Sequence, residues 1–216
     1  MGKRREPPTV SDDVVRVLLE RYGCPVPFHE VRTRFLGNIA TPAMAASPIK
    51  MVEGLWDGEL PAFDSIDDAN ELIGALVMGL WNRLARHQER KSLFRLSRVD
   101  SSSTRQDLAA LALMRRQELD GFIEGLFADE ESLDVPERAH HGLDILAELR
   151  ALFAAALDVA ENQAIGESKK DVETTFKHLR EMTRTAEQEI HAIVLSCVRA
   201  RRQMLTSLPA RKPTLH

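Results

Sequence analysis

The feature that most constrains this fold is a long apolar seam in the last third of the chain. Its members recur at alternating three- and four-residue steps, and none of them is charged. They are Val172, Phe176, Leu179, Thr183, Ala186, Ile190, Ile193, Cys197, Ala200 and Met204. This heptad spacing predicts one helix, roughly 60 Å long, that packs lengthwise against other helices.

A second seam of the same kind precedes it, between Pro136 and Gly166. Its members are Ala139, Gly142, Leu146, Leu149, Phe153, Ala156 and Ala160. Because Gly166 ends this helix and Ser168 with Asp171 resembles a capping box, the two helices are expected to form an antiparallel hairpin. The first helix reaches only about 40 Å, so the basic end of the last helix should overhang it.

The stretch from Ser47 to Gln88 predicts a short helix, an acidic loop and a long helix that begins at Ser65. Apolar residues at three- and four-residue steps define one face of the long helix. They are Ile66, Ala69, Ile73, Leu76, Leu80 and Leu84, widened by Leu72, Val77 and Trp81. We expect this helix to be central, and Gly74 and Gly79 within it to mark a close-packed neighbour.

Three further helices are expected. One runs from Ser11 to Gly23, and a second runs from about Phe28 to Leu36 with Gly37 and Asn38 as its stop. A third begins after the polar run that ends at Thr104 and carries Gly121 and Gly125 on one face. Glycines four residues apart let another backbone come close, so these two are predicted to be structural.

Composition supports an all-α class. Aromatic residues make up only 5% of the chain, which favours helices packed through Leu and Ala over a β-sandwich or barrel. The predicted organisation is a multi-helical N-terminal bundle over residues 11–127 followed by the long hairpin over residues 128–208, with flexible tails at 1–10 and 209–216. Two isolated cysteines and no long apolar run predict a cytoplasmic protein that does not enter a membrane.

Several short motifs in the first half resemble the YecA-like family of uncharacterised bacterial proteins. They are Phe35-Leu36, the helix from Pro48 to Trp56, Phe63-Asp64-Ser65 leading to Leu80-Trp81-Asn82, and the run from Gly121 to Gly125. The resemblance covers about residues 28–127 and implies a helical fold without known catalytic residues, with Asn82 buried and structural. Many relatives end in a cysteine-rich zinc-binding tail, which this chain replaces with a long helix.

The sharpest metal candidate is the pair Glu137 and His140, whose spacing puts both side chains on one helical face, as in di-iron bundles. Such a site needs a second Glu-x-x-His pair, and the sequence has none, so both are interpreted as surface residues of a first turn. No Gly-rich phosphate loop, His-Glu-x-x-His or Gly-x-Ser-x-Gly motif occurs. We therefore expect no metal, no cofactor and no enzymatic activity.

The predicted function is non-enzymatic protein–protein interaction, with self-association into a dimer through the overhanging seam. The residues predicted to make that contact are Ile190, Ile193, Cys197 and Met204. The alternative is a nucleic-acid-binding or transcription-modulating protein in which Arg199, Arg201 and Arg202 contact phosphates. Cations near a helix C-terminus also stabilise the helix dipole, so the cluster alone is not specific.

Overall fold

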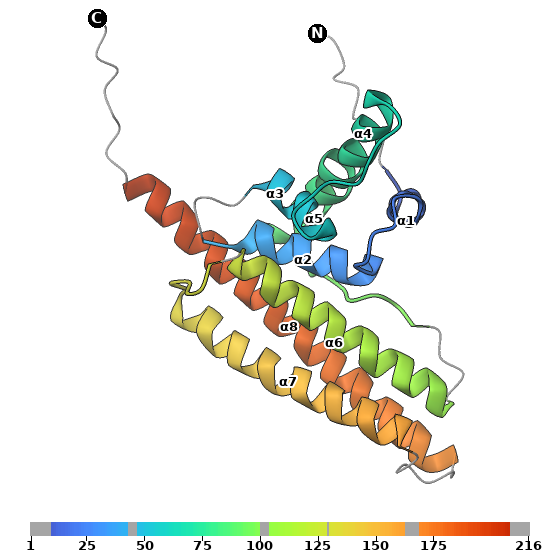
Figure 1. The fold of residues 1–216 in the computed structure, drawn as a ribbon. Coiled ribbons are helices and arrows are strands. Elements are labelled where there is room, and N and C mark those ends of the chain that lie inside the picture. Colours follow the sequence, from blue (N-terminus) through green and yellow to red (C-terminus); the bar gives the residue numbers. More distant parts are fainter. Residues whose placement is uncertain (1–9, 43–46, 100–103, 129, 163–168, 208–216) are drawn as a thin grey trace, which may run out of the picture.

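The computed structural model describes residues 10–42, 47–99, 104–128, 130–162 and 169–207, and within these ranges all regular structure is helical (Figure 1). The α-helices are α1 (Asp12–Arg21), α2 (Phe28–Ala40), α3 (Pro48–Glu53), α4 (Ile66–Ile73), α5 (Asn82–Leu84), α6 (Arg105–Phe127), α7 (Glu137–Glu161) and α8 (Lys169–Ser207). The predicted all-α class is confirmed. Residues 1–9 and 209–216 of the predicted tails, and the signals Gly166 and Ser168, lie outside the described residues.

Helix starts lie where the polar caps predict them. The hydroxyl of Ser65 accepts the backbone N–H of Asp68 at 3.2 Å and so begins α4. Thr104 and Asp107 form a reciprocal capping box at the start of α6. Each of these side chains satisfies a backbone donor that the first helical turn leaves without a partner, which is why local sequence locates these ends well.

Helices α6, α7 and α8 pack antiparallel as a three-helix bundle, so the predicted hairpin of α7 and α8 is confirmed (Figure 1). The two hairpin seams meet at Gly142, where an added Cβ would lie 2.7 Å from Cγ1 of Ile193. Because α6 packs against both α2 and α7, one hydrophobic core runs from Val15 to Val198. The predicted boundary at residue 127 therefore does not separate two cores.

The central element of the N-terminal half is α2, not the helix that begins at Ser65. Helix α2 lies between the bundle and the remaining N-terminal helices (Figure 1), and Phe35 and Leu36 are completely buried. It also continues to Ala40, beyond the predicted stop at Gly37 and Asn38. Gly37 is a contact glycine: an added Cβ would lie 2.7 Å from the backbone nitrogen of Leu126 in α6.

Gly121 and Gly125 are the partners of this close crossing, as predicted. An added Cβ at Gly121 would lie 2.9 Å from the carbonyl oxygen of Glu30, and one at Gly125 would overlap the backbone of Arg34. The three glycines allow α2 and α6 to touch backbone to backbone. Side chains of ordinary size would hold two helices 8–10 Å apart.

The rod that begins at Ser65 is peripheral and changes its pitch. Helix α4 continues into a π-helix, η2 (Gly74–Trp81), then α5 and a 3-10 turn, η3 (Ala85–Gln88). Its buried leucines recur every four residues, and they are Leu72, Leu76, Leu80 and Leu84. Ile66 is 80% exposed. Val10 packs against Gly79, whereas no described residue lies within 4 Å of a Cβ added at Gly74. A periodicity of 3.6 residues, which the prediction assumed, cannot reveal a π-helix.

Asn82 is exposed, which contradicts its prediction as a buried residue. Its amide donates to the carbonyl oxygen of Met78, four residues earlier in the same rod. Leu80 and Leu84 on either side face the core, so Asn82 between them lies on the opposite face. The bond is local to the rod and ties it to no other element.

Candidate functional site

The segment that shapes the surface of α8 is a strap without regular secondary structure, residues 89–99, which connects η3 toward α6. Phe94 and Leu96 of the strap are buried in the core. Two carboxylates meet the backbone of the strap: the N–H of Leu96 donates to Glu187 at 3.0 Å, and the N–H of Ser97 donates to Glu118 at 2.7 Å. These bonds fix the strap to α8 and α6.

Both carboxylates are buried and both have a cationic partner. Glu118 is completely buried and pairs with Arg115 one turn earlier in α6. Arg115 also donates to the carbonyl oxygen of Ser97 at 2.6 Å and to the hydroxyl of Thr183 at 3.1 Å. Glu187 pairs with Arg95 of the strap at 2.5 Å. A buried charge is stable in a folded protein only when it is paired in this way.

From the other side, Arg32 of α2 holds the strap. Its guanidinium donates to the hydroxyl of Ser97 at 3.0 Å and to the carbonyl oxygen of Arg95 at 3.2 Å, and it lies over the ring of Phe94. Burial of this guanidinium lowers the pKa of Arg32 from its usual value. The strap is thus connected to α2, α6 and α8 by polar contacts that a surface loop does not usually have.

Between the strap, α6 and α8 lies a groove of about 410 Å³, here termed the arginine groove. Five of its nine lining residues are arginines and one is a glutamate. The nine are Arg95, Arg98, Val99, Leu111, Arg115, Arg180, Thr183, Arg184 and Glu187. In a chain with a net charge of -4, this is a strong local excess of positive charge.

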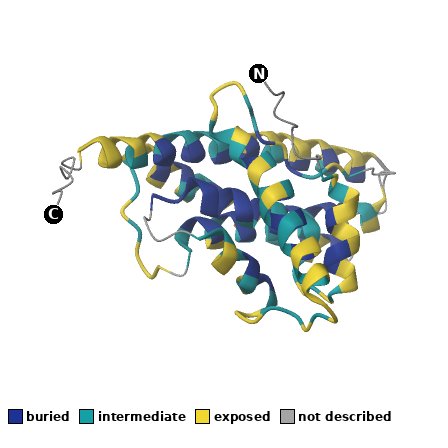
Figure 2. Cartoon of the chain, turned by 90° about the horizontal axis from the view of Figure 1, so that it is seen from above, coloured by how far each residue is buried: buried dark blue, intermediate teal, exposed yellow. Residues whose placement is uncertain are grey.

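A second groove of about 540 Å³, the α8-end groove, lies where the start of the strap meets the last turns of α8. Its lining residues are Gln88, Glu89, Arg90, Leu195, Val198, Arg199, Arg202, Gln203 and Thr206. Of the three arginines predicted to contact phosphates, the exposed Arg199 and Arg202 line this groove. The last described residues of α8, 202–207, are exposed (Figure 2).

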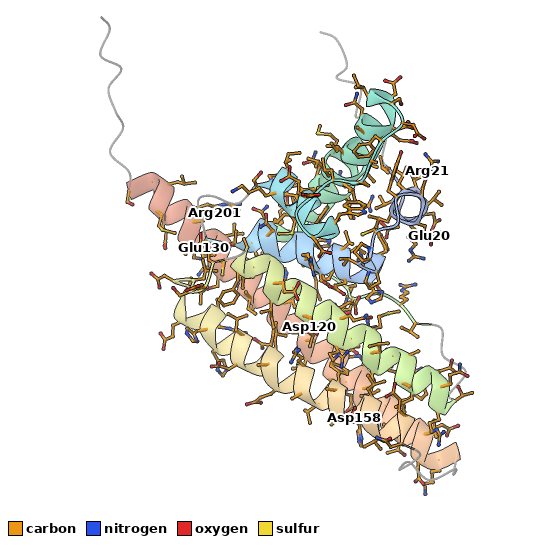
Figure 3. All side chains as sticks on the ribbon, viewed as in Figure 1. Glu20, Arg21, Asp120, Glu130, Asp158 and Arg201 are labelled. Atoms are coloured by element: carbon orange, nitrogen blue, oxygen red, sulfur yellow. The ribbon has the colours of Figure 1, made fainter. Side chains whose placement is uncertain are left out.

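Arg201, the third predicted phosphate contact, has an internal role. Its guanidinium donates to the carbonyl oxygen of Thr41, directly after α2, at 3.1 Å, and to the side chain of Gln88 at 3.5 Å. Partial burial, with the neighbouring Arg202, lowers the pKa of Arg201. Figure 3 labels it near the end of α8. Because its guanidinium is bonded to the chain's own backbone and to Gln88, Arg201 is poorly placed to contact the phosphate of a nucleic acid.

The seam predicted as a subunit interface is mostly internal. Ile190, Ile193 and Cys197 are completely buried against the chain's own helices, because α6, α7 and α2 together cover α8 along most of its length. Only Met204 of the four predicted contact residues is exposed, at 45%, and it has Leu205 beside it at 49%. The predicted overhang therefore consists of the last turns of α8 alone.

The candidate metal residues stay apart from other ligands. Glu137 and His140 are exposed on the first turn of α7, and the described residues contain no group of three or more His, Cys, Asp or Glu side chains that could hold a metal ion. Both cysteines are unpaired thiols. None of the described helices combines the length and apolar character needed to cross a bilayer.

Sequence reasoning missed the arginine groove because its residues come from three separate segments. Arg95 and Arg98 lie in the strap, Arg115 in α6, and Arg180 and Arg184 in α8. Only the four-residue spacing of Arg180 and Arg184, which places them on one helical face, was visible in the sequence. Their convergence with the strap depends on the buried carboxylates of Glu118 and Glu187, which have no sequence signature.

Comparison with known proteins does not assign the chain to a family: no protein-family model, no curated protein and no solved structure matches it. The resemblance to the YecA-like family thus stays a prediction, and the surfaces of α8 are the basis for a functional hypothesis.

Proposed function

We propose that this chain is a non-enzymatic interaction protein that self-associates, with the α8-end groove of each copy receiving an acidic helix face of the other. The supporting observation is the composition of this groove. It has an apolar contribution from Leu195 and Val198, and three arginines outweigh one glutamate in its lining. A groove of this kind suits an amphipathic helix with acidic residues beside its apolar ones.

The chain itself carries such a helix face. Five exposed residues of α7 recur at steps of three and four, so they form one line on the helix surface, here termed the α7 outer stripe. They are Asp144, Glu148, Leu152, Ala155 and Val159. Leu152 is 54% exposed and Val159 is 40% exposed, and the two acidic residues would oppose the excess positive charge of the groove.

Mutual docking of two copies would use both surfaces twice, as a two-fold symmetric dimer requires. The exposed Met204 and Leu205 would extend the contact beyond the groove. A stable interface buries about 800 Å² on each partner, so it requires more than the two side chains of Met204 and Leu205. The α7 outer stripe supplies the additional apolar area.

The test is the solution mass by light scattering of four samples: the wild type, two variants and an equimolar mixture of the variants. One variant reverses the groove charge (Arg199→Glu with Arg202→Glu), and a second reverses the stripe charge (Asp144→Lys with Glu148→Lys). Wild type is expected to be a dimer and each variant alone a monomer. An equimolar mixture of the two variants should dimerise again, because each then offers the surface that the other lacks.

A monomeric wild type, or a mixture that stays monomeric, would refute self-association through these surfaces. The control is the double variant Arg86→Glu with Arg116→Glu, which changes the net charge as much as the groove variant does. Both positions are helical and lie outside both grooves, so the solution mass should stay that of the wild type.

Nucleic-acid binding is the second candidate, favoured by the fact that arginines of both grooves lie along α8. It predicts association that weakens steeply with salt. Replacing Arg199 and Arg202 with alanine should then abolish a gel shift at low salt. Identical shifts for wild type and this variant would exclude the α8-end groove as the contact.

A further inference from the structure

We infer that the arginine groove is a binding site for a phosphorylated small molecule. The inference goes beyond the proposed self-association, since the two grooves have no lining residue in common. It rests on two exposed arginines of the groove that pair with no described carboxylate, on the hydrogen bonds that hold the neighbouring segments, and on the size of the space between them.

Each of the two carboxylates at the site pairs with one arginine of the groove. Arg115 pairs with the buried Glu118 and has further bonds to Ser97 and Thr183, so all of its nitrogens have partners. Arg95 pairs with Glu187, although its side chain remains 65% exposed toward the groove. The carboxylates of the site are therefore occupied by these two arginines and by backbone N–H groups of the strap.

The remaining positive charge is on the outside of the groove. Arg98 of the strap and Arg184 of α8 are exposed, and neither forms an ion pair with any described residue. Arg180 lies one turn before Arg184, over the ring of Phe176. An anion bound in the groove would therefore meet two guanidinium groups, those of Arg98 and Arg184, that no described carboxylate neutralises.

The groove is also preorganised. Arg180 and Arg184 project from the middle of α8, and Thr183 between them is held by Arg115. Arg98 follows directly after Ser97, whose backbone is bound on both its N–H and its carbonyl side. These bonds fix the backbone of the strap and one turn of α8, and guanidinium groups carried on such fixed segments match phosphate oxygens in pairs.

The size and the lining of the arginine groove limit the class of ligand that it can bind. A volume of about 410 Å³ lies within the usual range for small-molecule sites and is too small for a folded partner. Val99 and Leu111 add an apolar portion beside the arginines. The chemistry that fits is a phosphate monoester with a compact, partly apolar body, such as a mononucleotide.

The experiment is calorimetric titration of the full chain with inorganic phosphate, AMP and adenosine at low salt. AMP should bind most tightly, phosphate more weakly, and adenosine not detectably. In the variant Arg98→Gln with Arg184→Gln, AMP affinity should fall at least about tenfold, because charge-assisted hydrogen bonds are lost. The matched variant Arg86→Gln, at an exposed arginine outside the groove, should bind AMP as the wild type does.

Two outcomes would overturn the inference. The first is that neither AMP nor phosphate binds the wild type while thermal unfolding shows it to be folded. The second is that a single-stranded oligonucleotide binds, with a salt dependence of several charges, whereas AMP does not; that result would assign the arginines to a nucleic-acid backbone instead. The oligomeric state is measured separately by light scattering. A chain that does not bind AMP can therefore still be a dimer, and a monomeric chain can still bind AMP.

Discussion

Gly125 of α6 lies directly against the backbone of Arg34 in α2: an added Cβ would lie 2.7 Å from the carbonyl carbon of Arg34 and closer still to its oxygen. No side chain can occupy that position unless the two helices move apart. This contact, together with those at Gly37 and Gly121, joins the N-terminal helices to the bundle.

Replacing Gly125 with alanine should destabilise the protein by about 2–3 kcal/mol, because overpacking at a backbone contact forces a helix to shift. Urea unfolding followed by circular dichroism measures the change. Gly74→Ala is the matched control. No described residue lies within 4 Å of a Cβ there, and the dihedral angles of Gly74 are helical, so alanine should stabilise the protein by up to about 1 kcal/mol. Equal effects at the two positions would contradict the close crossing.

The buried pair of Arg115 and Glu118 predicts a strongly non-additive response. Glu118→Leu alone should cost about 3–5 kcal/mol, because it leaves a buried guanidinium without its counter-charge. Adding Arg115→Met should recover part of that loss, since no unpaired guanidinium is then buried, but the N–H and carbonyl groups of Ser97 still lack the partners that the pair provides. A double-mutant cycle in urea measures the coupling.

The exposed pair of Arg21 and Glu71 provides the comparison. Glu71→Ala should change stability by less than about 1 kcal/mol, because water already solvates both groups. If Glu118→Leu were as mild as Glu71→Ala, the strap would not depend on the buried carboxylate.

The two thiols should differ in reactivity. Burial raises the pKa of Cys197 to about 12, so almost none of it is thiolate at pH 8, and it is shielded from solvent. Cys24 is partly exposed, and burial raises its pKa from the usual value as well. A disulfide reagent at pH 8 should therefore modify Cys24 first, with Cys197 reacting on the timescale of unfolding. Fast labelling of a Cys24→Ser variant would contradict the buried position of Cys197.

His87 predicts a pH-dependent loss of stability. Partial burial lowers the pKa of His87 below its usual 6.5, and its Nδ1 contacts the carbonyl oxygen of Ser92 at 2.8 Å. A base with a lowered pKa in the folded state protonates more readily when unfolded, so stability falls as the pH drops below 6.5 toward the folded value. Above pH 6.5 the effect is absent.

The variant His87→Gln should show a smaller loss of stability between pH 7 and pH 5 than the wild type, measured as the urea midpoint. His140→Gln, at an exposed position, serves as the control for removing a histidine. If the pH profiles of wild type and His87→Gln were parallel, the titration of His87 would not contribute.

Local sequence alone determined the class of this fold, most of its helix starts and the pairing of its last two helices. Caps such as Ser65 and Thr104 act within one turn, and the long seams of α7 and α8 are periodic, so both are readable without tertiary information. The close contacts of Gly121 and Gly125 were predictable as well, because only glycine allows two backbones to touch.

Only the tertiary structure decided which face meets which neighbour. It buried Ile190, Ile193 and Cys197 inside the chain, since α8 is covered from several sides at once. In the N-terminal half, tertiary packing made α2 the central element. Gly37 of α2 lies at a close helix contact, although its local sequence predicts the end of a helix. The arginine groove likewise depends on long-range hydrogen bonds between the strap and buried carboxylates, which no periodicity records.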